Sequence, residues 1–307
     1  MTDGDNERPV KRRKTSYSDD VYARLDDCRL FKNLVLALKE VVTKVNLEVT
    51  PKGMFLEALD TAHVCFVNMH MEAACFDEFH CRDRHTLGLD LECLHTVLNC
   101  ARAGSMLVMC YRKSKEDMFE LTLASAEESR VYQLNLLNID VDEVGVQDLE
   151  RTLTFCMEST QLRRIVRDMS KFGADILKIG ARAHDKVLFT AKCVLGKCVS
   201  SVPVNDVVEM KLERPTYGHY ALPYLTRFCR ASGLSRMVGV GIDGTTNMLA
   251  LEFPFRTVGE DSEDCVGERI GYIQYTLAAR TMDDDDDDAW DQACEDLPGG
   301  ETESDEE

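Results

Sequence analysis

The sequence predicts an α+β protein built from two similar domains, each with two helices packed on antiparallel sheet. Four segments place apolar residues at helical spacing, and the two later segments repeat the two earlier ones at an offset of 131 residues. The stretches that follow each helix alternate apolar and polar residues, as strands do. Because two helix pairs keep one offset and each is followed by strands, we interpret the chain as an internal duplication.

The first repeated helix is clearest in its second copy, Gln161–Phe172. Its basic side chains share one arc of the helix and its apolar side chains share the opposite arc. The basic residues are Arg163, Arg164, Arg167 and Lys171. The apolar residues Leu162, Ile165, Val166 and Met169 align with Phe31, Leu34, Val35 and Leu38 in the first copy, which also exposes Lys32 and Lys39.

A β-hairpin is expected after each copy of this helix. The first hairpin consists of Asn46–Thr50, a turn at Pro51–Gly53, and Met54–Ala58. The second consists of Ile176–Gly180, a turn near His184, and Val187–Thr190. The shared order of helix and hairpin supports the duplication.

The second repeated helix keeps the same offset. Leu91, Leu94, Val97 and Leu98 align with Leu222, Leu225, Phe228 and Cys229. Strand-like alternation follows each copy, at Met106–Tyr111 and at Met237–Ile242. The outer face of the later copy carries Arg227 and Arg230, whereas the earlier one carries His95 and Asn99.

These patterns give the following domain limits. Residues 1–20 form a polar tail, 21–134 the first domain, 135–150 a polar connector, 151–280 the second domain, and 281–307 an acidic tail. Further strands are expected at Ala62–Met71, Asp117–Ala124, Val207–Leu212 and Met248–Phe253. The foldable length of about 260 residues suits two domains.

Charge is distributed very unevenly along the chain. The net charge is −19, and Thr281–Glu307 holds 14 acidic and no basic residues, so the rest carries only about −5. Such a tail cannot bury a core, and we expect it to be disordered. Pro9–Lys14, PVKRRK, resembles a nuclear localisation signal. Thirteen cysteines without a signal peptide indicate reduced thiols, and no apolar run is long enough for a membrane span.

Segments that resemble motifs of enzymes or metal sites lack the structural surroundings that those motifs require. Gly239–Gly244 fits a dinucleotide-binding glycine pattern, but the residues after it read as a strand instead of the required helix. Cys75, His80, Cys81 and His85 cluster without the spacing of zinc ligands. No nucleophile–base arrangement stands out. We therefore expect a protein that is not an enzyme and needs no cofactor or metal.

Basic faces on three of the four helices indicate a polyanion partner. Lysine and arginine contacts to phosphate give affinity that is independent of base sequence. Few aromatic residues lie on these faces, so base stacking on single strands is not the expected mode.

Four segments resemble one known family in order and at near-family spacing. These are Leu59–Val64, Phe76–Arg84, Ile139–Val146 and Arg164–Gly173, and the resemblance extends from about Ala23 to Arg280. The family is proliferating cell nuclear antigen, the eukaryotic and archaeal DNA sliding clamp, of which this chain looks like a divergent and possibly viral member.

The resemblance implies a DNA-clamp fold in which three subunits close head-to-tail into a ring. The sheets would form the outside, and twelve helices would line a hole around double-stranded DNA. The implied edges between subunits lie near Asp117–Ala124 in one subunit and Lys197–Val204 in the next. A clamp loader is implied as a partner. The residues expected to face DNA are Lys32, Lys39, Arg163, Arg164, Arg167, Lys171, Arg227 and Arg230.

The resemblance also implies a site for polymerases and other clients that carry short clamp-binding motifs. An aliphatic–aromatic plug needs an apolar pocket beside an extended backbone. The matching residues are Leu59, His63, Phe66, Val144, Gly145, Val146, Met248 and Ala278. Met248 replaces a family proline, which predicts altered client preference. The family's modified lysine falls near Ala183, so control by ubiquitin or SUMO is not expected to carry over.

Two other interpretations remain open. The same fold can act as a monomeric or dimeric viral processivity factor without a ring. Alternatively, the run Asp283–Asp288 suits an acidic nuclear chaperone of basic proteins. Oligomeric mass separates the first alternative from a ring, and deletion of the tail tests the second.

Overall fold

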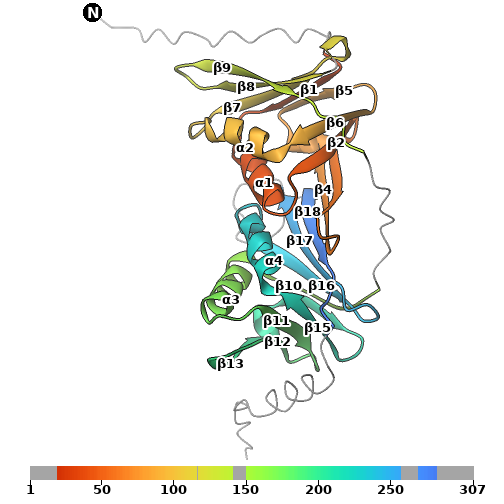
Figure 1. Cartoon of the computed structure of the whole chain (residues 1–307), viewed down its shortest axis with the longest axis vertical. Helices are drawn as coiled ribbons and strands as arrows, with labels where there is room; N and C mark the ends of the chain where they lie inside the picture. The colour runs from red at the N-terminus through yellow and green to blue at the C-terminus, as the bar shows by residue number, and fades with distance from the viewer. Residues whose placement is uncertain (1–18, 116, 141–149, 257–268, 282–307) are drawn as a thin grey trace, which may run out of the picture.

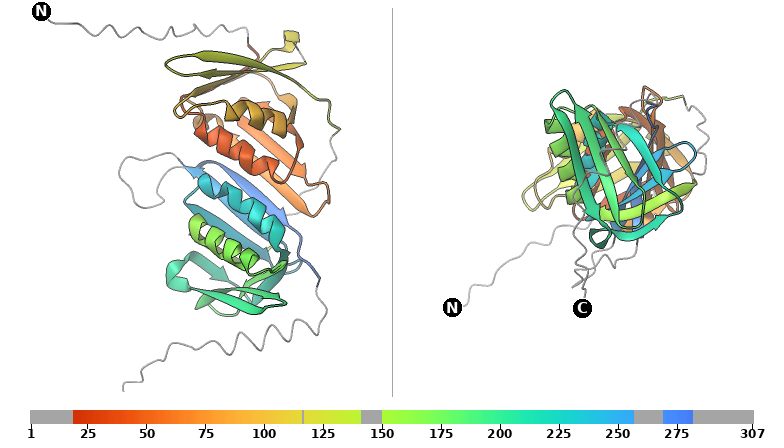
Figure 2. Two further views of the ribbon diagram at one scale, coloured as in Figure 1. Left: turned by 60° about the vertical axis from the view of Figure 1, so that its left-hand side comes forward. Right: turned by 90° about the horizontal axis from the view of Figure 1, so that it is seen from below.

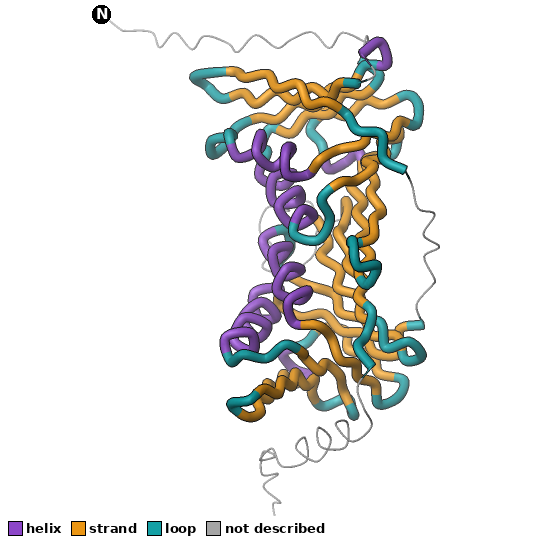
Figure 3. The backbone as a smooth tube through the Cα atoms, viewed as in Figure 1, coloured by secondary structure: helices purple, strands orange, loops and turns teal. Residues whose placement is uncertain are grey.

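The computed structural model describes residues 19–115, 117–140, 150–256 and 269–281. Four α-helices run along one side of an elongated molecule, and the sheets lie on the other side (Figure 1). The tube view shows the same division between helices and strands in the middle of the molecule, with strands above and below the helices at the two ends (Figure 3). This arrangement agrees with the predicted α+β class.

The described part of the first half contains two α-helices and nine strands. They are β1 (Val21–Leu25), α1 (Arg29–Lys39), β2 (Lys44–Thr50), β3 (Gly53–Leu59), β4 (Cys65–Glu72), β5 (Glu78–Cys81), β6 (His85–Asp90), α2 (Leu91–Asn99), β7 (Met106–Tyr111), β8 (Met118–Ala124) and β9 (Ser129–Asn135).

The described part of the second half repeats this order element by element. Its elements are β10 (Arg151–Glu158), α3 (Ser159–Lys171), β11 (Ile176–Ala181), β12 (Lys186–Cys193), β13 (Gly196–Pro203), β14 (Val208–Leu212), β15 (Thr216–Ala221), α4 (Leu222–Phe228), β16 (Met237–Asp243), β17 (Leu249–Arg256) and β18 (Arg269–Leu277). The predicted duplication is therefore present in the fold.

The strands form three antiparallel sheets. One has the order β5-β1-β7-β8-β9, and another has the order β13-β12-β11-β15. The third, of nine strands, runs β14-β10-β16-β17-β18-β4-β3-β2-β6 and so joins the two halves. The junction is the pairing of β18 with β4, from Gly271 opposite Met71 to Leu277 opposite Cys65.

The helices bury the apolar faces that the sequence predicted. In α1, Phe31, Leu34, Val35 and Leu38 are at most 2% exposed, and the aligned residues of α3 are at most 6% exposed. In α4, Leu222, Leu225 and Phe228 are buried in the same way. Burial of each such side chain contributes about 1.5–3 kcal/mol, which fixes the helices on the sheets.

The two halves also share a core at their junction. The Phe228 ring stacks on Tyr275 with centroids 4.4 Å apart. The Tyr275 hydroxyl donates a hydrogen bond to the Ala37 carbonyl in the first half, at 3.2 Å. A side chain of the second half therefore bonds to the backbone of α1 beside the β4–β18 strand pair.

Some sequence-based expectations were wrong in detail. Asp117–Ala124 is not an edge, because β8 pairs on both sides, with β7 and β9; the edge strand is β9. The expected strand at Ala62–Met71 begins only at Cys65, since the Asp60 carboxylate accepts hydrogen bonds from the turn before it. Gly239 and Gly241 lie within β16, and the next element after Gly244 is the strand β17, in agreement with the rejected dinucleotide site.

Candidate functional site

The four helices form a continuous row along one side of the molecule (Figure 2). α1 packs on α2, and α3 packs on α4. The side chains that point away from the core on α3 and α4 are largely basic. Arg163, Arg164 and Lys171 of α3 and Arg227 of α4 are exposed, and so is Arg230 in the 3-10 turn Cys229–Gly233 that follows α4.

Two of the predicted cations are partly neutralised by carboxylates. The Lys39 ammonium lies 3.1 Å from Glu92 of α2, and the Lys39 side chain is only 16% exposed. The Arg167 guanidinium lies 3.3 Å from Asp168, but its side chain stays 58% exposed. Lys32 of α1 is half-buried. The first half therefore offers less free positive charge than the sequence alone suggested.

Helix α2 adds no basic side chain to the row. Asp90 caps its N-terminus by accepting hydrogen bonds from the backbone of Glu92 and Cys93. Burial and the charge of Lys39 lower the pKa of His95, so this imidazole is neutral at pH 7. The Asn99 amide lies 3.2 Å from the His95 ring. The positive charge of the row is thus concentrated on α3 and α4.

A second group of predicted residues meets at the ends of adjacent strands. Leu59 is opposite Phe66 in the β3–β4 pair, and both point to the outer face of the sheet. The Ala278 backbone N–H donates to the Val64 carbonyl at 2.9 Å, which brings the end of β18 to the same place. Met248 immediately precedes β17, whose first residue Leu249 is opposite Leu277.

The turn beside this strand-end cluster is held by one buried carboxylate. Asp60 is 5% exposed and accepts hydrogen bonds from the backbone of Ala62, Val64 and Cys65. The Tyr224 hydroxyl of α4 donates a further hydrogen bond to it at 2.5 Å. Within this turn, His63 adopts a positive φ of 58° and is exposed. The turn is therefore fixed to the second half as well as to the first.

These contacts shift two pKa values in opposite directions. Burial raises the pKa of the Asp60 carboxyl, but the hydrogen bonds from Tyr224 and the backbone outweigh it and lower the pKa below its usual value. Burial and the bond to Asp60 raise the pKa of Tyr224 to about 12. The pair therefore stays carboxylate and phenol at neutral pH.

Not every predicted client residue joins the cluster. Phe66 points to the outer face of the sheet, but it is only 9% exposed, so little of its side chain is accessible. Val64, which the sequence analysis did not single out, is 38% exposed and is one of the few exposed large apolar residues in the described part. Its position in the sequence, next to the predicted client residue His63, could have indicated that Val64 belongs to the same site. Val144, Gly145 and Val146 lie outside the described residues.

The start of the connector lies on the outer face of the first half. The Leu137 N–H donates to the Gly88 carbonyl at 2.8 Å, and the Asn46 amide donates to the Ile139 carbonyl at 3.0 Å. A Cβ on Gly88 would lie 2.0 Å from the Leu137 oxygen, so only glycine allows this approach. The connector therefore leaves the first half across β6 and β2.

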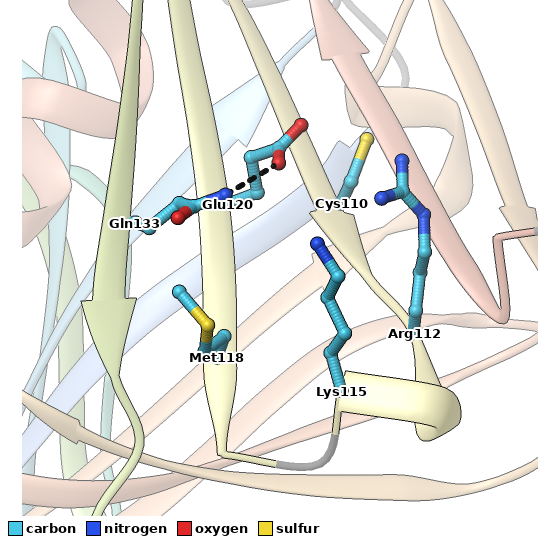
Figure 4. Close-up of a pocket in the computed structure, with 6 residues that line it drawn as sticks. All are labelled: Cys110, Arg112, Lys115, Met118, Glu120 and Gln133. Atoms are coloured by element: carbon cyan, nitrogen blue, oxygen red, sulfur yellow. Dashed lines mark hydrogen bonds between the residues drawn. The ribbon is translucent and has the colours of Figure 1, made fainter.

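Edge strand β9 borders a shallow hollow on the outer face of its sheet (Figure 4). Gln133 of β9 donates a hydrogen bond to Glu120 of β8 at 3.3 Å. The hollow is also lined by Cys110, Arg112, Lys115 and Met118. These residues form no nucleophile–base pair. The hollow adjoins β9, which is an edge strand of its sheet.

The residues considered as metal ligands point to different partners. The Cys75 thiol lies 3.0 Å from the Ile270 carbonyl, and the Cys81 thiol lies 3.0 Å from the Asp83 carbonyl. In the described ranges, no group of three or more His, Cys, Asp or Glu residues is arranged to hold a metal ion. All cysteines that the structure describes are free thiols. No described helix is long and apolar enough to cross a membrane.

Comparison with known proteins relates both halves to one family. Residues 21–144 match the N-terminal domain and residues 145–261 the C-terminal domain of proliferating cell nuclear antigen. The chain is 29% identical to proliferating cell nuclear antigen 2 of Drosophila melanogaster over 269 residues, covering 86% of this chain and 98% of that protein.

A viral protein and a solved structure are also similar. The chain is 28% identical to the probable DNA polymerase sliding clamp 1 of Paramecium bursaria Chlorella virus 1, covering 69% of this chain and 83% of that protein. The crystal structure of the proliferating cellular nuclear antigen from Entamoeba histolytica superimposes with a TM-score of 0.76 at 22% identity. It covers 86% of this chain and 100% of that one.

Proposed function

Because this chain belongs to the proliferating cell nuclear antigen family, we propose that it is a DNA sliding clamp and polymerase processivity factor. It encircles double-stranded DNA, tethers client proteins to it, and acts as a scaffold, not a catalyst. A similar viral protein carries the name of a probable polymerase sliding clamp, which supports this role. The domain limits 21–134 and 151–280 are part of the proposal.

The observation that carries this proposal is the row of four helices on one side of the molecule (Figure 1). A ring that turns this side inward gathers its basic residues around the DNA and leaves the rest of an acidic protein outside. The lining comprises Lys32, Lys39, Arg163, Arg164, Arg167, Lys171, Arg227 and Arg230. Weak phosphate contacts orient the DNA without stopping sliding, because the ring holds it topologically.

The repeat itself indicates how copies would join. Inside the chain, β18 pairs with β4, whereas their counterparts β9 and β13 are both sheet edges. Edge strands with free hydrogen-bonding groups favour pairing with another chain. Pairing of β9 with β13 of the next copy repeats the internal junction and leads to a closed, head-to-tail assembly. We propose a homotrimer.

The repeat also predicts the register between copies. Tyr132 of β9 occupies the place of Tyr275, and Cys198 of β13 occupies the place of Val67. Because Tyr275 is opposite Val67, Tyr132 is expected opposite Cys198 of the next copy. One residue earlier, Val131, which is 54% exposed in the single chain, is expected opposite Val199.

The ring is tested by mass and by cross-linking. Sedimentation should give about three times the chain mass of 34.7 kDa. Oxidation of a Val131→Cys/Val199→Cys variant should link the copies covalently. The matched Val131→Cys/Ser201→Cys variant, displaced by two residues on the same face, should link much less. A monomeric or dimeric mass would favour the processivity factor without a ring.

The DNA role is tested by reversing Arg163, Arg164 and Arg167 to Glu in one variant. Retention on circular DNA and stimulation of a polymerase should both fall. The same number of reversals at the exposed residues Lys52, Lys113 and Lys115, which lie away from the helix row, serves as the control. Unchanged retention in the α3 variant would contradict the assignment.

We place client binding at the strand-end cluster. Leu59, His63, Val64, Met248 and Ala278 support it, and Phe66, Val144, Gly145 and Val146 complete the set that the family resemblance implies. Clients would be polymerases and other proteins with short clamp-binding motifs, and a loader would open the ring. The basic segment Pro9–Lys14, which lies outside the described residues, would direct the protein to the nucleus.

A further inference from the structure

The outer face of the sheet β13-β12-β11-β15 carries an excess of positive charge. Core-facing residues such as Leu177, Phe189 and Ala191 are fully buried, so the residues between them point outward. The outward positions include Lys178, Lys186, Lys192 and Lys197. None of the outward strand positions of this sheet is Asp or Glu.

The corresponding strands of the first half have the opposite charge. On β2, β3, β4 and β6, the outward residues include Glu48, Glu57, Glu72 and Asp90, with Lys44 as the single lysine. The fold therefore does not require a basic outer face. Its charge is a property of the second half alone, in a protein whose net charge is −19.

The centre of this basic face is hollowed and lined by cations. The Lys178 ammonium lies 3.7 Å from the centroid of the Tyr217 ring, in a cation–π contact. Arg182, Leu188 and Thr190 line the same hollow. Lys186 lies 3.9 Å from the neighbouring Asp185, at the limit of an ion pair. Because Lys178 is only 6% exposed, an anionic chain laid across the sheet would meet the lysines of β12 and β13.

The acidic C-terminal segment begins at the edge of this face. The Arg280 N–H donates to the His219 carbonyl of β15 at 2.8 Å, and Thr281 is the last described residue. Asp283–Asp288 follows in the sequence. Crossing from β15 to β13 spans about 14 Å at strand spacing, and six extended residues reach about 20 Å. The acidic run is therefore long enough to cross the whole sheet.

We propose that Asp283–Asp288 docks on the outward lysines of β12 and β13 of its own chain. The docked segment neutralises this face and denies it to nucleic acid, so that duplex DNA binds only at the helix row. The inference depends on charge complementarity and on where the chain leaves β15. It does not rest on the proposed ring, because a single chain supplies both surfaces.

The single tryptophan of the protein, Trp290, reports on this contact because it follows Asp288 by two residues. In the full chain at low salt, its fluorescence anisotropy should be high, since docking suppresses the fast motion of a free terminus. High salt shortens the Debye length and should lower the anisotropy about twofold. An anisotropy that is low at all salt concentrations would overturn the proposal.

A matched pair of variants separates this face from general charge effects. Lys186→Glu/Lys192→Glu should lower the Trp290 anisotropy at low salt to its high-salt value. Lys52→Glu/Lys113→Glu makes the same charge change at exposed sites of the first half and should leave it unchanged. Equal effects of the two variants would contradict docking on this sheet. Circular dichroism confirms that each variant is folded.

A duplex titration tests the alternative occupant. A chain ending at Thr281 should bind a short linear duplex several-fold more tightly than the full chain, and Lys186→Glu/Lys192→Glu should remove that gain. If the full and shortened chains bind the duplex equally through these lysines, the face is a nucleic-acid site and the tail does not occupy it. Linear duplex is used because a ring does not retain it.

Discussion

The two halves of this protein share a fold but differ in almost everything they show to solvent. In α1 and α3 four buried apolar residues correspond. The basic residues of α1 are two half-buried lysines and Arg29, which is exposed and paired with Asp27, whereas α3 carries four exposed basic residues. The outward faces of the corresponding sheets differ even more, from acidic to basic. Apolar contacts thus preserve the architecture, and the exposed positions are free to acquire separate roles.

The largest expected difference concerns DNA. Replacing Arg163, Arg164 and Arg167 together by Gln should remove about three phosphate contacts. The slope of log affinity for DNA against log salt concentration should therefore become shallower by about three. Replacing Lys32 and Lys39 by neutral residues should make this slope shallower by only about one, because Glu92 already pairs with Lys39. Affinity is measured over a salt series. Equal slopes for the two variants would remove the proposed dominance of the second half.

A second prediction concerns client binding at the strand-end cluster. Val64→Asp should weaken a peptide with an aliphatic–aromatic plug about tenfold or more, since it places a charge among apolar contacts. Val208→Asp, at the more exposed edge strand β14 of the same nine-stranded sheet, is the control. Calorimetric titration compares the two, and a similar loss in both variants would place the client site elsewhere.

The junction between the halves offers a test of stability. Tyr224→Phe removes the hydroxyl that donates to the buried Asp60 carboxylate, and it should lower the free energy of unfolding by about 1–2 kcal/mol. Tyr272→Phe removes a hydroxyl from the sheet surface and should have little effect. Urea unfolding monitored by circular dichroism provides both values. A neutral Tyr224→Phe variant would show that water replaces the donor.

The same pair predicts how stability changes with pH. Because the pKa of Asp60 is lowered on folding, its contribution is present above the unfolded carboxyl pKa and is lost as the pH falls through the folded value. Because the pKa of Tyr224 is raised to about 12, stability also falls as the pH rises above the ordinary tyrosine value. Burial also raises the pKa of Tyr220 and Tyr275, so Tyr224→Phe should reduce the loss of stability at high pH without abolishing it, as measured by urea unfolding across pH.

The smallest expected effect is that of the ion pair Lys39–Glu92. Its contribution should be about 0.5 kcal/mol, since Glu92 is 59% exposed and water screens the charges. A double-mutant cycle with Lys39→Met and Glu92→Gln isolates this coupling. Coupling well above that value would mean that α1 and α2 depend on this contact for their packing.

Much of the fold was predictable because apolar spacing is a local signal. The four helices and the strands β7 and β16 follow directly from periodicity, and the constant offset revealed the duplication. Strands β5 and β6 were not predicted, since their residues alternate poorly and include His80, Cys81 and His85, which were first weighed as part of a metal cluster. The pairing of β18 with β4 joins residues about 200 positions apart, which no local pattern reveals.

The candidate sites were predictable only in part. Helical spacing placed the basic residues of α3 on one exposed face, but the pairing of Lys39 with Glu92 depends on how α1 and α2 pack. Likewise, Leu59 and Phe66 could be named from family resemblance, whereas the contribution of Val64 depends on the turn that Asp60 organises. Sequence therefore identifies which side chains are available, and the tertiary contacts decide which of them are free to bind.

The continuous sheet across β18 and β4 also has a mechanical consequence. Bending one half against the other would require seven residue pairs to separate together and would also break the hydrogen bond from the Tyr275 hydroxyl to the Ala37 carbonyl. Each subunit should therefore move as one rigid body, without a hinge between its halves. A force that opens the assembly would act mainly on the interfaces between copies, where the hydrogen bonds of one pair of strands must break.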